Sequence, residues 1–117
     1  DGQYLPFRDK AFEVVWCSHV IEHVKNPYLL LKELHRVCKL DGKIELRCPH
    51  RLGINVKSPH HLHYYTRSWF IEHFEKIGWK FTMKTTIEPK VLFKIPFAKI
   101  RLAFLLPNEI QITIFKK

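Results

Sequence analysis

The stretch Phe-Glu-Val-Val-Trp-Cys-Ser-His-Val-Ile-Glu-His-Val, residues 12–24, decides the fold of this chain. It begins with apolar, mostly β-favouring residues as far as Cys17 and then changes to the polar residues Ser18 and His19. This pattern predicts a mostly buried strand that ends in polar groups. Ligands of open α/β sheets bind just beyond the carboxyl ends of such strands. We therefore expect this strand to present Ser18, His19 and, a turn later, His23 to a ligand crevice.

Length and composition indicate one globular domain. The chain has 117 residues, of which 46% are hydrophobic and 14% aromatic, so we treat residues 1–117 as a single domain with one core. Its formal net charge of +9 suits an anionic partner, such as an acidic substrate or a membrane surface, but excess lysine also serves solubility. Nucleic acid is not expected as a partner, because the sequence contains no recognised nucleic-acid-binding module.

The cysteines and the hydropathy pattern bear on location. Cys17, Cys38 and Cys48 are widely spaced and odd in number, which predicts reduced, buried thiols in a cytoplasmic protein. The sequence has no apolar run of about 20 residues, so no membrane span is expected. Residues 90–106 mix apolar residues with lysine and arginine, which allows peripheral membrane contact. Because Pro96 interrupts any continuous helix there, residues 87–108 are predicted to be an insertion between the last two strands.

Apolar spacing and turn residues predict two helices and four strands. Asn26 and Pro27 start the first helix, which Asp41-Gly42 is expected to close. Thr66 or Ser68 starts the second helix, which runs to Ile77. The predicted strands are Phe12 to Cys17, Lys43 to Cys48, Trp79 to Thr86 and Glu109 to Phe115.

The order of these elements argues for an α/β fold with a parallel core, into which the last strand can enter antiparallel. Residues 43–48 alternate between apolar and charged side chains. A strand covered by helices on both faces would be apolar on both, so one face of this strand is expected to lie in water or against a polar surface.

Several motifs together carry a family resemblance. They are Asp1-Gly2, Leu5-Pro6-Phe7, His19-Val-Ile-Glu-His-Val24, Leu34-His-Arg-Val-Cys-Lys39 before Asp41-Gly42, and His60-His-Leu-His-Tyr-Tyr-Thr66. With them, about the first 85 residues resemble the central and later parts of class I S-adenosylmethionine-dependent methyltransferases, in the branch called methyltransferase type 11 or UbiE/UbiG-like. The resemblance implies a Rossmann-like methyltransferase sheet, or its C-terminal half with about four strands and two main helices.

The resemblance also implies roles for individual residues. Asp1 matches the acidic residue that accepts a hydrogen bond from the adenine amino group, and Gly2 matches its neighbour at the adenine ring. Leu5 falls in the same cofactor-binding region, and Ser18 and His19 match the segment that lines the methionine end of the cofactor.

The resemblance also implies that His23 and the histidine loop lie where family members contact the methyl acceptor. His23, His61 and His63 are the catalytic candidates, because a histidine can serve as general base where the acceptor must lose a proton. His60 and Tyr64 are the substrate candidates. Alternatives remain open: the histidine loop can be plain surface or, less favoured, a metal site, and His23 can simply pack the turn after the strand. Glu22 is interpreted as a solvated turn residue and Cys17 as an unreactive thiol.

The chain also departs from the family pattern. The family's glycine-rich loop and ribose-binding carboxylate would precede Asp1, and the glycines present, Gly2, Gly42, Gly53 and Gly78, form no such loop. We therefore expect S-adenosylmethionine to bind this chain weakly or not at all by itself, whether the chain is part of a longer methyltransferase or a short protein that keeps half the fold.

Two functions follow from that departure. The first is methyl transfer to a small-molecule or glycan-like acceptor, with the missing half supplied in cis or in trans. The second is that of an inactive relic that works as a binding or assembly module through its basic surface and open sheet edge. If the chain is a short protein that keeps half the fold, the strand from Phe12 to Cys17 becomes an apolar edge, which predicts a homodimer or a partner chain that pairs there.

Overall fold

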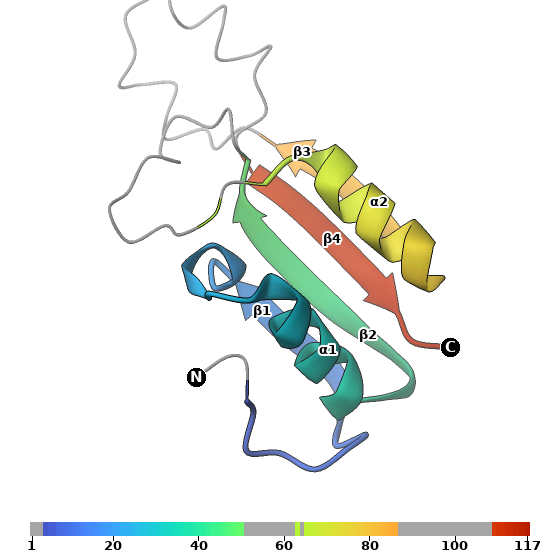
Figure 1. Cartoon of the computed structure of the whole chain (residues 1–117). Coiled ribbons are helices and arrows are strands. Elements are labelled where there is room, and N and C mark those ends of the chain that lie inside the picture. The colour runs from blue at the N-terminus through green and yellow to red at the C-terminus, as the bar shows by residue number, and fades with distance from the viewer. Residues whose placement is uncertain (1–3, 51–62, 64, 87–108) are drawn as a thin grey trace, which may run out of the picture.

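The computed structural model describes residues 4–50, 63, 65–86 and 109–117 of the chain. Along the chain (Figure 1), the elements are β1 (Phe12–Ser18), the 3₁₀ turn η1 (Ile21–His23), α1 (Pro27–Val37), β2 (Cys38–Pro49), α2 (Arg67–Ile77), β3 (Lys80–Thr86) and β4 (Glu109–Phe115). The predicted insertion at residues 87–108 lies outside the described residues.

The described strands form one sheet in the order β1-β2-β4-β3. β1 and β2 are parallel, whereas β4 is antiparallel to both of its neighbours, β2 and β3. β1, β2 and β3 therefore all point the same way, and β4 enters between them from the opposite direction. The parallel core and the antiparallel last strand are both confirmed. As a consequence, the carboxyl ends of β1 and β2 and the amino end of β4 meet at one edge of the sheet.

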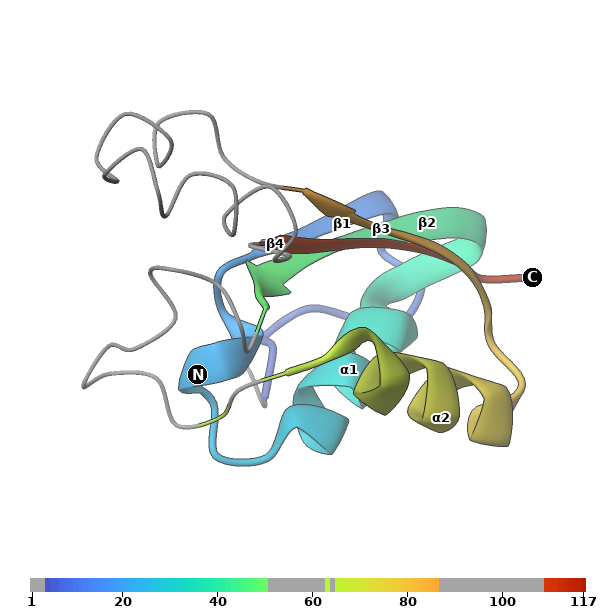
Figure 2. The ribbon, with the colours of Figure 1, turned by 90° about the horizontal axis from the view of Figure 1, so that it is seen from above.

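Both helices lie on the same face of the sheet (Figure 2). The core forms between them and that face, because the buried apolar side chains of β2 and β4 alternate along each strand and point toward the helices. Fully buried members include Leu30, Leu31, Ile44, Leu46, Phe70, Phe74, Ile110, Ile112 and Ile114. The α/β, Rossmann-like fold expected from the sequence is confirmed.

No helix in the described part of the chain covers the opposite face. There Glu45 lies beside Thr113, whose hydroxyl donates to its carboxylate at 2.9 Å. The one-sided polarity expected of residues 43–48 is confirmed. The prediction that β1 is mostly buried is wrong, however, since Val14 and Trp16 point to this open face and are 52% and 58% exposed. The guanidinium of Arg47 lies over the Trp16 ring, 4.8 Å from its centre, and covers part of this ring.

The helix starts are where the sequence predicts them. The Asn26 side chain accepts hydrogen bonds from the backbone N–H groups of Tyr28 and Leu29 at 3.1 and 3.3 Å. The Thr66 hydroxyl caps α2 through the N–H of Trp69. α2 ends at Gly78, which takes the left-handed conformation with φ of 77°.

The predicted end of the first helix is wrong. α1 stops at Val37, and Cys38 begins β2, so Asp41 and Gly42 belong to the strand. Pairing explains the difference: the Asp41 N–H donates to the Lys116 carbonyl at 2.6 Å and the Lys116 N–H donates to the Gly42 carbonyl at 3.1 Å. At Gly42 a Cβ atom would lie 2.6 Å from the carbonyl oxygen of Glu13. This glycine therefore serves close backbone packing.

Candidate functional site

The candidate site lies at the edge of the sheet where β1 and β2 end and β4 begins. Ser18 is the last residue of β1 and is half-buried. His19 follows it with a φ of 54°, a left-handed conformation that is uncommon for a residue with a side chain. Its N–H donates to the carbonyl of Arg47 on β2 at 2.8 Å. The main chain thus turns sharply at His19 and sends its imidazole out from the end of the strand.

The turn η1 places the next two site residues. The N–H of His23 donates to the Val20 carbonyl at 2.9 Å, which closes the turn. Ile21 is fully buried and anchors the turn in the core. Glu22 is buried as well, with 1% of its surface exposed, so the interpretation of Glu22 as a solvated residue is wrong. The turn is pressed against the end of the sheet, which removes Glu22 from water.

The carboxylate of Glu22 faces two imidazoles. Its Oε1 lies 3.7 Å from Nδ1 of His19 and 3.7 Å from Nε2 of His23. The other side of His19 faces β4, where Nε2 lies 3.5 Å from Oε2 of Glu109. Glu109 is also buried, and its Oε1 accepts a hydrogen bond from the Gln111 side chain at 2.9 Å. We name His19, Glu22, His23 and Glu109 the His–Glu cluster.

Glu109 could not be identified as a site residue from the sequence. It is far from the strand-end motif along the chain and follows a segment with no recognisable motif. Only the antiparallel insertion of β4 brings its first residue to the edge where β1 ends. Glu22, by contrast, lies inside the motif, and the apolar residues on both sides of it were a signal that the turn is buried.

His63 lies beside the cluster, but its ring points elsewhere. Its backbone N–H donates to the carbonyl of Glu22 at 3.3 Å, whereas ring atom Nε2 lies 3.0 Å from the carbonyl oxygen of Lys25. This ring lines a pocket of about 450 Å³ with Lys25, Asn26, Pro27, Tyr28, Tyr65 and Trp69. Tyr65 is buried there, and its hydroxyl donates to the Ile21 carbonyl at 3.4 Å. Burial also raises the pKa of that hydroxyl above its ordinary value.

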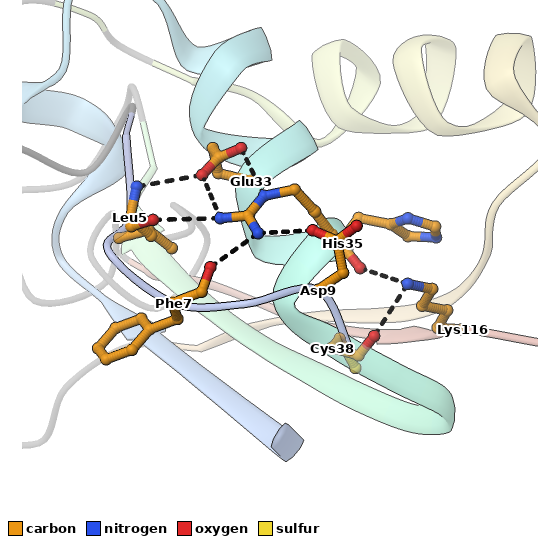
Figure 3. A network of polar contacts seen from close by, with 8 residues as sticks. Leu5, Phe7, Asp9, Glu33, His35, Cys38 and Lys116 are labelled. Carbon is orange, nitrogen blue, oxygen red and sulfur yellow. Dashed lines mark hydrogen bonds and ion pairs between the residues drawn. The ribbon is translucent and has the colours of Figure 1, made fainter. Parts of the chain in front are cut away.

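Leu5 is held in place by the first helix (Figure 3). Its N–H donates to Oε2 of Glu33 at 3.1 Å, and its carbonyl accepts from Nη2 of Arg36 at 3.1 Å. Arg36 also donates to the Phe7 carbonyl and to the carboxylates of Asp9 and Glu33. These bonds connect the segment before β1 to α1.

The cysteines near the site are unreactive. Burial, followed by the nearby charge of Glu22, raises the pKa of Cys17 to about 12. Burial also raises the pKa of Cys48, which lies in the same part of the core. Both thiols therefore stay protonated near neutral pH and are poor nucleophiles.

The remaining predicted site residues are Asp1, Gly2, His60, His61 and Tyr64, which lie outside the described residues. In the described part, no set of three His, Cys, Asp or Glu side chains is arranged to hold one metal ion. The same part contains no helix that is both long enough and apolar enough to cross a membrane.

The described residues fit one side of an S-adenosylmethionine site. Ser18 and His19 stand at the end of a parallel strand, where ligands of α/β sheets bind. Two buried carboxylates lie next to them, and negative charge suits the cationic sulfonium of that cofactor.

Comparison with known proteins identifies a family for the first part of the chain. Residues 1–46 match the family described as "Methyltransferase domain". A demethylmenaquinone methyltransferase from Streptomyces griseus is 36% identical over 44 residues, which are 38% of this chain and 19% of that protein. The matched segment thus spans about a fifth of this curated relative.

Solved structures extend the likeness to the whole fold. An S-adenosylmethionine-dependent methyltransferase from Archaeoglobus fulgidus superposes with a TM-score of 0.68 at 19% identity, over 92% of this chain and 61% of that one. Phosphoethanolamine N-methyltransferase 2 from Haemonchus contortus, solved with S-adenosyl-L-methionine, gives a TM-score of 0.69 at 15% identity, over 99% of this chain and 36% of that one. Residues 1–46 thus match the methyltransferase domain family, and the fold of the chain is similar to that of S-adenosylmethionine-dependent methyltransferases.

Proposed function

We propose that this protein takes part in methyl transfer from S-adenosylmethionine to a small-molecule or glycan-like acceptor. One observation carries the proposal: the segment that matches the methyltransferase domain family ends β1 at Ser18 and places His19 against the buried carboxylates of Glu22 and Glu109. An α/β sheet binds its ligands at this type of edge.

The chain's own residues have distinct tasks in this proposal. Asp1, Gly2 and Leu5 would bind the adenosine part of the cofactor, and Ser18 and His19 its methionine end. When bound, the cofactor supplies an activated methyl group on a sulfonium sulfur. The protein mainly aligns the acceptor with that group. Such alignment can lower the activation barrier by about 7–11 kcal/mol in favourable cases.

His23 is the proposed general base. Its Nε2 lies 3.7 Å from the Glu22 carboxylate, whose charge would stabilise the imidazolium formed when the acceptor gives up a proton. His60, His61, His63 and Tyr64 are proposed to surround the acceptor. The His63 backbone bond to Glu22 supports that placement, because it brings the start of this segment to the cluster.

The chain is proposed to act together with further polypeptide, in cis or in trans. One face of the sheet is not covered by any described helix, and β1 has no described strand on its outer side. Both features support this, since Val14 and Trp16 offer apolar surface there. A homodimer or a partner chain that pairs at the strand from Phe12 to Cys17 would supply this further polypeptide. An anionic partner for the basic surface belongs to the same proposal, and the three free, buried cysteines support a cytoplasmic location.

Calorimetric titration of S-adenosylhomocysteine into the protein tests the proposed function. We expect weak, saturable binding that is lost when His19→Ala removes a wall of the site, while the exposed Glu75→Gln on α2 leaves it unchanged. The absence of any heat up to about millimolar ligand would overturn the proposal. It would mean that the binding free energy is weaker than about −4 kcal/mol, the value for a millimolar dissociation constant. That result would revive the alternative of a binding or assembly module, which the comparisons do not favour.

A further inference from the structure

One oxygen of the buried Glu22 carboxylate has no partner among the described residues. Oε2 is shielded from solvent and no hydrogen bond reaches it. A buried polar atom without a partner costs about 1–3 kcal/mol, and more when the group is charged, so such an atom in a folded protein requires an explanation.

The charges nearby make the cost larger. Glu109 is buried at the same edge, and among the described residues neither carboxylate forms an ion pair with a lysine or an arginine. Their ionic contacts are to His19 and His23, at 3.5–3.7 Å, which is too long for a strong charge-assisted hydrogen bond. A chain with a net charge of +9 thus gathers two acidic groups at one point of its sheet edge, where the described part of the chain offers them no strong cation.

The cluster has an outer wall and an inner floor. The side chains of His19 and His23 are 49% and 41% exposed, so they stand at the surface. The side chains of Glu22 and Glu109 are 2% and 7% exposed, so they form the floor. A ligand that passes the imidazoles would reach the carboxylate oxygens of the floor, and these groups can only accept hydrogen bonds when they are ionised.

The ligand that matches this floor is a cation with several N–H donors. A bare metal ion is disfavoured, because no three of the described groups converge on one point at ligand distance. A primary ammonium group has three donors and can reach oxygens that are several ångströms apart. We propose that the His–Glu cluster binds the protonated amine of a small organic cation, with Oε2 of Glu22 as its principal acceptor.

As the methyl acceptor of the proposed function, the bound ammonium would first give a proton to His23, so that the lone pair of its nitrogen can form the bond to the methyl carbon while the bond from that carbon to sulfur breaks. Only this identification of the amine as methyl acceptor rests on the proposed function. The binding of the amine itself does not require the cofactor. The two can therefore be tested separately on the same protein.

The test uses n-butylammonium chloride as the probe and n-butanol as its neutral control. Each is titrated into the protein at fixed ionic strength while ¹H–¹⁵N spectra are recorded. We expect saturable shifts with n-butylammonium that centre on residues 18–23 and 109–111, and no such shifts with n-butanol. Glu22→Gln and Glu109→Gln should each weaken binding about tenfold or more, because each removes a charged acceptor. Glu75→Gln on α2 is the matched control and should change nothing.

The outcomes separate clearly. If Glu22→Gln does not fold, as judged by circular dichroism, Glu109→Gln alone decides. Equal shifts with amine and alcohol, or shifts that both variants retain, would overturn the inference. Tight binding of MgCl₂ or MnCl₂ at the same residues, without binding of the amine, would also overturn it in favour of a metal ion. Amine binding without S-adenosylhomocysteine binding would support the inference and contradict the proposed function. Binding of S-adenosylhomocysteine without binding of the amine would support the proposed function and overturn the inference.

Discussion

Arg36 shows how a single side chain can organise a segment that lacks regular structure. Its guanidinium bonds to the carbonyls of Leu5 and Phe7 and to the carboxylates of Asp9 and Glu33. The fixed fork of donors in arginine suits such a multiple contact, whereas a lysine would satisfy only part of it. The segment before β1, which carries Leu5, is thus placed from helix α1.

Glu33 should make the stability of this segment sensitive to acid. Its hydrogen bond from Arg36, with that from the Leu5 N–H, lowers the pKa of Glu33 to about 2 from an ordinary 4.5. Because the folded-state pKa is lowered, the stabilisation is complete above the ordinary value and is lost as pH falls toward 2. Urea unfolding at a series of pH values should show a smaller acid-induced loss of stability for Glu33→Gln than for the unaltered protein. An identical pH dependence for the two proteins would contradict this.

Alanine substitutions at Gly42 and Gly78 compare a glycine in close backbone contact with one that has open space around it. In Gly42→Ala the added Cβ would meet the Glu13 carbonyl at 2.6 Å and the Lys39 carbonyl at 2.8 Å, and neither atom can move without shifting a strand. We expect this substitution to lower the free energy of unfolding by about 3 kcal/mol. Gly78→Ala meets no atom and only strains a left-handed residue, which costs about 1 kcal/mol. Thermal or urea unfolding measures both, and a smaller effect at Gly42 than at Gly78 would show that the β1–β2 contact is looser than described.

At the scale of elements, helix α1 depends on the residue that caps its start. Asn26 accepts two backbone hydrogen bonds there, so Asn26→Ala should cost about 1 kcal/mol of unfolding free energy. Asn26→Gly should cost only a few tenths of a kcal/mol, since glycine is also tolerated at this position. Chemical denaturation of the two variants checks the order. Equal losses would mean that the side-chain bonds to Tyr28 and Leu29 contribute little.

Local signals explain which elements could be predicted from the sequence. The caps at Asn26, Thr66 and Gly78 act over a few residues, so both helix starts and one helix end were predicted correctly. The end of α1 was not, because the bonds that recruit Asp41 and Gly42 into β2 come from Lys116, far along the chain. Likewise, Ser18, His19 and His23 could be predicted together because they lie in one motif, whereas Glu109 reaches the cluster only through the pairing of β4.

At the scale of the molecule, the described helices cover the sheet on one side only. Val14 and Trp16 are exposed on the other side, next to the open edge of β1. Light scattering coupled to size-exclusion chromatography should therefore show a dimer or larger assembly. Lysine at both positions, Val14→Lys with Trp16→Lys, should yield a monomer, because charged residues at an exposed edge oppose pairing. A monomeric unaltered protein would contradict the proposed association.

The position of β4 also has a consequence for how the protein is made. β4 is the last described strand in the chain, yet it lies inside the sheet and supplies Glu109 to the cluster. During synthesis, β2 and β3 have no partner between them until β4 has left the ribosome. The nascent sheet must remain open until then, and the buried acidic floor at its edge comes into existence only with the completion of this strand.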